Sequence, residues 1–82
     1  MAHHKITAGV MDVPAGALRR WQEDGRAEVI GEGAHGVIVE KEDRELLKIE
    51  LCETAEYAAD TLARFYAFYD AVRRVTVIRI TD

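Results

Sequence analysis

The sequence predicts a small α+β domain in which one long helix packs across an antiparallel sheet of four or five strands, with a short helix near the N-terminus. Three observations lead to this prediction. Apolar residues alternate in several short segments, as they do in half-buried strands. Residues 54–74 have helical periodicity, and turn residues separate the segments. At 82 residues, of which 49% are hydrophobic, the chain has the size of a single domain covering 1–82.

The N-terminal part of the chain predicts one strand and one short helix. Residues 5–11 alternate weakly in the manner of a strand. Residues 12–25 predict a helix, with Asp12 as the N-cap, Pro14 in the first turn and Gly25 at the end. The apolar residues of this helix recur at the spacing of one helix face, at Pro14, Ala17, Leu18 and Trp21.

Four further segments complete the predicted fold. Strands are expected at 26–30, 37–42 and 46–51, with turns between them. In the last strand, "VTVIRI", Val75 and Val77 face one way while Ile78 and Ile80 face the other. This pattern is typical of a strand that is covered on both sides.

The long helix carries five of the six aromatic residues. Its apolar residues cover about 200° of the circumference, whereas a helix packed on one sheet needs an arc of little more than 100°. The excess predicts a protein interface at Tyr57, Tyr66, Phe68 and Tyr69, used either by a second copy in a homodimer or by another protein. The alternative is that the N-terminal helix covers the surplus through Leu18 and Trp21.

Charge and cysteine content narrow the function classes. The net charge is −4 and the pI is near 5.3, and no basic cluster exceeds two adjacent arginines, which argues against binding to nucleic acid or to an anionic membrane. No apolar run approaches the ~18 residues of a membrane span. Cys52, the only cysteine, excludes an internal disulfide and favours a reducing, cytoplasmic location, where we expect it to be a small buried residue. No metal site is expected, because His3 and His4 lack further ligands nearby.

The stretch from Gly31 to Gly36, here called the glycine turn, matches the pattern G-x-G-x-x-G. Glycines let backbone N–H groups approach a phosphate without interference from side chains. A dinucleotide-binding turn would need a helix directly after it, and a Walker loop would need Gly-Lys-Ser/Thr; neither follows here. The alternative is a glycine-rich hairpin turn, because glycine is the usual residue where φ is positive.

With strands on both sides, "IGEGAHGVIV" and the later "ELLKIE" resemble the N-lobe of protein-kinase-like folds, over residues 26–80. This resemblance implies that Gly31, Gly33 and Gly36 cover the phosphates of ATP and that Lys48 contacts the α- and β-phosphates. The chain departs from the family in lacking a catalytic loop and the D-F-G metal-binding motif, and its helix glutamate, Glu56, lies in the first turn. It is therefore not a complete kinase.

The sequence favours a non-catalytic, cytoplasmic protein-interaction or regulatory module, of the adaptor, antitoxin or phage-type inhibitor class, that needs no cofactor and no catalytic residues. The alternative is a kinase-N-lobe-like nucleotide-binding fragment, or a piece of a pseudokinase, that binds ATP and needs a partner chain.

Overall fold

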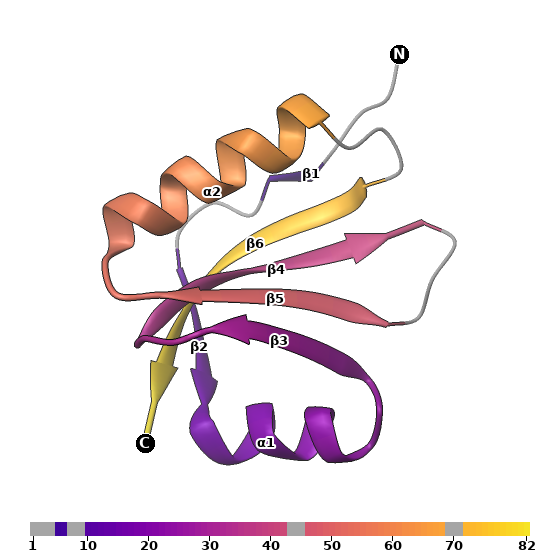
Figure 1. Cartoon of the computed structure of the whole chain (residues 1–82), viewed down its shortest axis with the longest axis vertical. Coiled ribbons are helices and arrows are strands. Elements are labelled where there is room, and N and C mark those ends of the chain that lie inside the picture. The colour runs from indigo at the N-terminus through magenta and orange to yellow at the C-terminus, as the bar shows by residue number, and fades with distance from the viewer. Residues whose placement is uncertain (1–4, 7–9, 43–45, 69–71) are drawn as a thin grey trace.

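The structure, a computed structural model, describes residues 5–6, 10–42, 46–68 and 72–82; at 5, 6, 59, 62, 63 and 65–68 only the backbone is described. These residues form six strands and two helices (Figure 1). In chain order the elements are β1 (Lys5–Ile6), β2 (Met11–Pro14), α1 (Ala15–Glu23), β3 (Ala27–Gly31), β4 (His35–Lys41), β5 (Leu47–Cys52), α2 (Ala55–Phe68) and β6 (Val72–Thr81).

All six described strands belong to one sheet, in the order β1–β6–β4–β5–β3, and β2 lies on the same side of β6 as β1 does. β4 runs antiparallel to both of its neighbours, β5 and β6. The other pairs are parallel: β1 and β2 with β6, and β3 with β5. The sheet is therefore mixed.

The predicted antiparallel sheet is wrong, although the coarser prediction of a small α+β domain is confirmed. The connections between the strands explain why the sheet is mixed. Each helix joins two strands that run in the same direction, β2 to β3 through α1 and β5 to β6 through α2. A helix of this kind returns the chain to the end of the sheet at which the previous strand began, so the next strand is parallel to it.

The predicted long helix across the sheet is also wrong. α2 ends at Phe68 rather than at Arg74, and β6 begins at Val72. Burial and pairing explain the difference, because Val72 and Val75 are almost completely buried and Arg74 lies opposite Lys5 on one side and Glu40 on the other. The β-branched valines favour a strand at these positions.

The short N-terminal helix is confirmed, but it begins later than predicted. Pro14, not Asp12, directly precedes α1, and no side chain caps the first turn. Asp12 instead lies in β2, where its carboxylate accepts hydrogen bonds from the Arg79 guanidinium of β6 at 3.1 and 3.3 Å.

The interpretation of the glycine turn as a hairpin is wrong as well, because β3 and β4 do not pair with each other; β5 lies between them.

The two helices cover opposite faces of the sheet (Figure 1). On the α1 side, Leu18 is buried in a cluster to which Trp21 also packs: Val13, Leu18, Ala27, Ile38, Ile49 and Ile78. The α2 side holds a second cluster: Val37, Val39, Cys52, Ala58, Val72 and Val75. Val77 packs on the α2 side and Ile80 on the α1 side, which confirms that β6 is covered on both sides. The chain supplies both covers itself.

Candidate functional site

A cleft of about 210 Å³ opens on the α2 side of the sheet, at its β3 edge. We call it the Lys48 cleft. Its lining comes from β3, β4 and β5: Glu28, Ile30, Val39, Lys41, Lys48, Ile49 and Glu50. α2 packs on β6 and β4 and reaches β5, so it leaves this end of the sheet open.

The strand register explains why the cleft is polar. One row across the sheet runs Glu28, Lys48, Val39, Val75, and the next runs Ile30, Glu50, Val37, Val77. Residues in such a row share one face of the sheet. The valines lie under α2, and the charged residues lie beyond its cover.

Lys48 makes an ion pair inside the cleft. Its Nζ lies 2.8 Å from Oε2 of Glu28, and the two side chains are 36% and 51% exposed. In the kinase-like arrangement the lysine would pair with a glutamate of the helix, whereas here its partner comes from the edge strand. An ion pair this exposed contributes only about 0–1 kcal/mol to stability.

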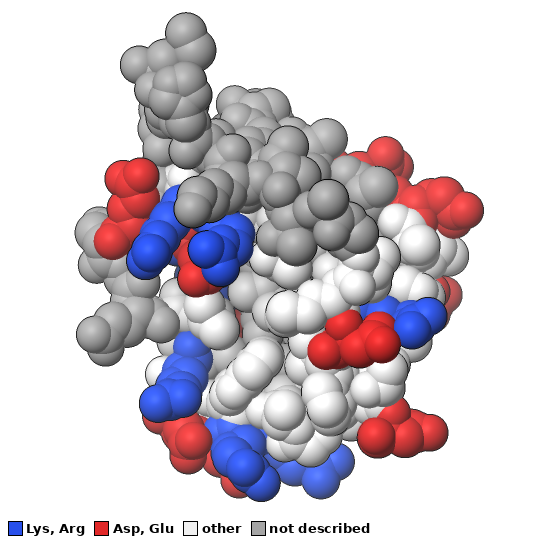
Figure 2. Space-filling model, turned by 180° about the vertical axis from the view of Figure 1, so that it is seen from behind, with Lys and Arg blue, Asp and Glu red and all other residues white. Residues whose placement is uncertain are grey.

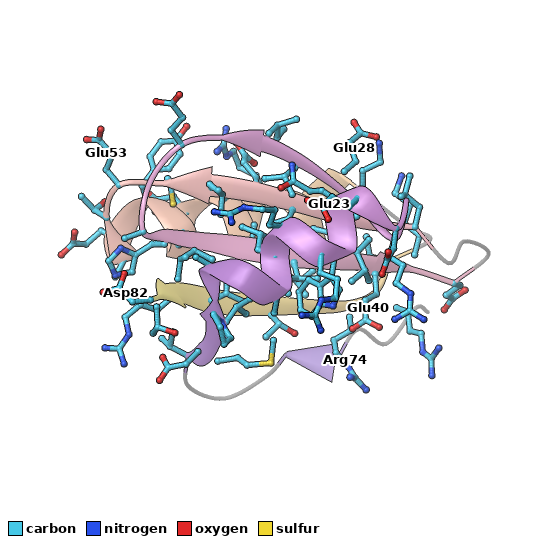
Figure 3. All side chains as sticks on the ribbon, turned by 90° about the horizontal axis from the view of Figure 1, so that it is seen from below. Glu23, Glu28, Glu40, Glu53, Arg74 and Asp82 are labelled. Carbon is cyan, nitrogen blue, oxygen red and sulfur yellow. The ribbon has the colours of Figure 1, made fainter. Side chains whose placement is uncertain are left out.

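Other ion pairs likewise join directly opposite residues of neighbouring strands. Glu40 of β4 pairs with Arg74 of β6 at 3.7 Å (Figure 3). Asp12 of β2 pairs with Arg79 of β6 at 3.0 Å. On the face drawn in Figure 2, acidic and basic side chains are interspersed.

The three predicted phosphate-binding glycines are packed against the end of β5. Gly31 and Gly33 have positive φ angles of 80° and 138°. A Cβ on either residue would overlap the backbone of Leu51 or of Cys52, and one on Gly36 would overlap the carbonyl of Glu50. The glycines therefore let the chain cross closely over the end of β5 on its way from β3 to β4.

The glycine turn and Lys48 do not line one cavity. The Lys48 cleft includes Lys48 but none of the three glycines. Gly31 lies opposite Leu51, three residues from Lys48 along β5, which corresponds to about 10 Å. The structure thus separates Lys48 from the three glycines, which the kinase-like resemblance places around one nucleotide.

Of the predicted interface residues, Tyr57 is the one whose side chain is described. Its side chain, in the first turn of α2, is 48% exposed. Tyr66 and Phe68 belong to α2 but their side chains lie outside the described residues, and Tyr69 lies outside them altogether.

Tyr57 borders a second, more open cleft of about 340 Å³ at the end of β5. The lining joins the glycine turn to the start of α2: Glu32, Leu51, Cys52, Glu53, Thr54 and Tyr57. Thr54 caps the helix, because its Oγ1 accepts a hydrogen bond from the backbone N–H of Tyr57 at 3.1 Å. His35, at the start of β4, lies nearby with its Nδ1 3.3 Å from the carbonyl oxygen of Glu53.

Cys52 is a buried free thiol, as the sequence predicted. Burial raises its pKa, the negative charge of Glu50 raises it further, and a hydrogen bond with the backbone of Thr54 lowers it in part. Its thiolate form is therefore scarce at neutral pH, which suits a packing residue rather than a nucleophile.

Sequence reasoning missed Glu28 and Ile30, which form the outer wall of the Lys48 cleft. Glu28 lies opposite Lys48 because β3 pairs with β5 in parallel. That pairing does not follow from the local pattern of either strand.

Within the described residues no helix is long and apolar enough to cross a membrane, and no cluster of three metal-ligating side chains occurs.

Neither a protein-family model, nor a curated protein, nor a solved structure matches the chain.

Proposed function

We propose that this chain is a non-catalytic, cytoplasmic protein-interaction module with a regulatory role, of the adaptor, antitoxin or phage-type inhibitor class, and that it binds its partner through the face of α2 around Tyr57. The observation that carries this proposal is an exposed tyrosine–arginine pair on α2. The guanidinium of Arg64 lies 5.6 Å from the centroid of the Tyr57 ring. Tyrosine and arginine are the residues, with tryptophan, that contribute most often to binding energy at protein interfaces.

The pair is held in place before any partner arrives. An Arg64 nitrogen donates a hydrogen bond to Oγ1 of Thr61 at 3.0 Å, and that hydroxyl donates to the backbone carbonyl of Tyr57 at 3.0 Å. Thr61 itself is 2% exposed. Ordering both side chains in advance lowers the entropy that binding must overcome.

Site-specific photocrosslinking in the cells that carry this protein tests the proposal. A photoreactive phenylalanine derivative at position 57 should crosslink one protein, and the same group at Arg19, which is exposed on α1, should not. Arg64→Ala should reduce the crosslink at 57 several-fold, because it removes the group that fixes the ring. Equal crosslinking at both positions, or no effect of Arg64→Ala, would contradict the proposal.

The exposure of Lys48 in its cleft favours a second candidate function, which is nucleotide binding at Lys48 with the backbone of Gly31, Gly33 and Gly36, in a kinase-N-lobe-like or pseudokinase fragment that needs a partner chain. Binding would require Lys48 to leave Glu28 for a phosphate. ATP at millimolar concentration should then raise the melting temperature by about 3 °C or more. Lys48→Ala should abolish this rise, and Glu28→Gln should enlarge it because the competing carboxylate is gone. An unchanged melting temperature with ATP would exclude this candidate.

A further inference from the structure

The two edges of the sheet differ in how they are protected against pairing with another strand. On one edge, β2 carries Pro14, which cannot donate a backbone hydrogen bond. The other edge is β3, which pairs with β5 alone among the described strands. β3 has no proline, no lysine and no bulge in its register, and Ile30 is 55% exposed on it. These are the features of an edge that is open to pairing.

The backbone of β3 offers hydrogen-bonding groups to the outside. The N–H of Leu47 in β5 donates to the carbonyl of Arg26 at 2.8 Å, so this carbonyl points toward β5, whereas the N–H of Arg26 donates to the carbonyl of Trp21 at 2.8 Å. Strand residues alternate in this respect. Glu28 and Ile30 therefore also point their backbone groups toward β5, and Ala27, Val29 and Gly31 present theirs to the open edge.

We propose that two copies of the chain join through their β3 edges in antiparallel orientation, with Val29 opposite Val29 of the second copy, so that one continuous sheet spans both. A strand that lies antiparallel to its own copy has two-fold symmetry, and the same edge then serves both subunits. The outward groups of Ala27, Val29 and Gly31 supply the hydrogen bonds between the copies.

Charge favours this register over the two registers that are shifted by one residue. With Val29 opposite itself, Arg26 faces Glu32 of the second copy at both ends of the ribbon, and Glu28 faces Ile30. In the register with Glu28 opposite itself, two carboxylates meet, and with Ile30 opposite itself, Glu28 faces Glu32. Like charges directly opposite are unfavourable and opposite charges favourable. Arg26, Glu28 and Glu32 are all exposed and available for these contacts.

The Lys48 cleft gives the contact an apolar component. Glu28 and Ile30 lie on the α2 side of β3, and both line the cleft. In the proposed register Ile30 of each copy packs beside the aliphatic parts of Glu28 and Lys48 of the other. Figure 3 shows Glu28 at the β3 edge of the sheet. The assembly therefore buries the most exposed large apolar side chain among the described residues.

Charge-swap variants test the proposal by sedimentation equilibrium. The native chain should form a dimer. Glu32→Arg places two arginines opposite each other at both ends and should weaken the dimer by about tenfold or more, and Arg26→Glu should do the same with two glutamates. Each variant should keep the native circular dichroism spectrum, because both side chains are exposed.

Mixing the two single variants supplies the decisive control. Arg26→Glu chains and Glu32→Arg chains repel their own copies but complement each other at both ends, so the mixture should form a heterodimer. Ile30→Lys should give monomers, and Glu56→Arg, a charge reversal on α2, should leave the native dimer unchanged. A native monomer, a Glu32→Arg variant that dimerises as tightly as the native chain, or a mixture that stays monomeric would each overturn the proposal.

Discussion

Gly33 has a backbone φ of 138°, and its position against the carbonyl of Cys52 leaves no space for a Cβ. Both facts have the same cause, because the chain must pass from β3 over the end of β5 to reach β4. The glycines that suggest phosphate binding in the sequence thus have a structural explanation at the level of single residues. A glycine's conformational freedom and its lack of volume are both used here.

Gly33→Ala should lower the free energy of unfolding by about 3 kcal/mol, because alanine disfavours this φ and its Cβ would push Cys52 away. Gly16→Ala in α1 is the matched control. A Cβ at Gly16 meets nothing within 4 Å, and alanine should stabilise the helix by about 0.5 kcal/mol. Urea unfolding followed by the fluorescence of Trp21, the only tryptophan, measures both changes. Similar effects of the two substitutions would contradict the packing described for the turn.

At the scale of elements, α1 covers the face of the sheet that lies opposite to α2. A strand with apolar residues on both faces needs two covers, and α1 provides the second one through Leu18. The apolar faces of β6 therefore give no support for a partner. The proposed partner site at Tyr57 and Arg64 is not covered by α1, because α1 lies on the other side of the sheet from α2 (Figure 1).

Leu18→Ala should lower the free energy of unfolding by about 2–3 kcal/mol, since it removes a buried side chain from between α1 and the sheet. Arg19→Ala, one residue further along the same helix and exposed, should change it by less than about 0.5 kcal/mol. Urea unfolding measures both. If the two variants were equally stable, α1 could not be the cover of this face.

At the scale of the whole molecule, the two helix crossovers decide the architecture. They make the sheet mixed, place β6 between β1 and β2 on one side and β4 on the other, and leave β3 with β5 as its one partner among the described strands. The Lys48 cleft and the proposed dimer contact both follow from the position of β3 beside β5. Moving β3 next to β4, as a hairpin would, removes both.

The sequence by itself determined the positions of most strands, the short helix, the buried state of Cys52 and the two apolar faces of β6, because alternation, turn residues and residue volume act over a few neighbouring positions. Only the tertiary structure decided which strands pair, where α2 ends, and that Glu28 rather than a helix glutamate meets Lys48. Strand order depends on contacts between residues far apart in the chain, and the energy of those contacts leaves little trace in the local pattern of either strand.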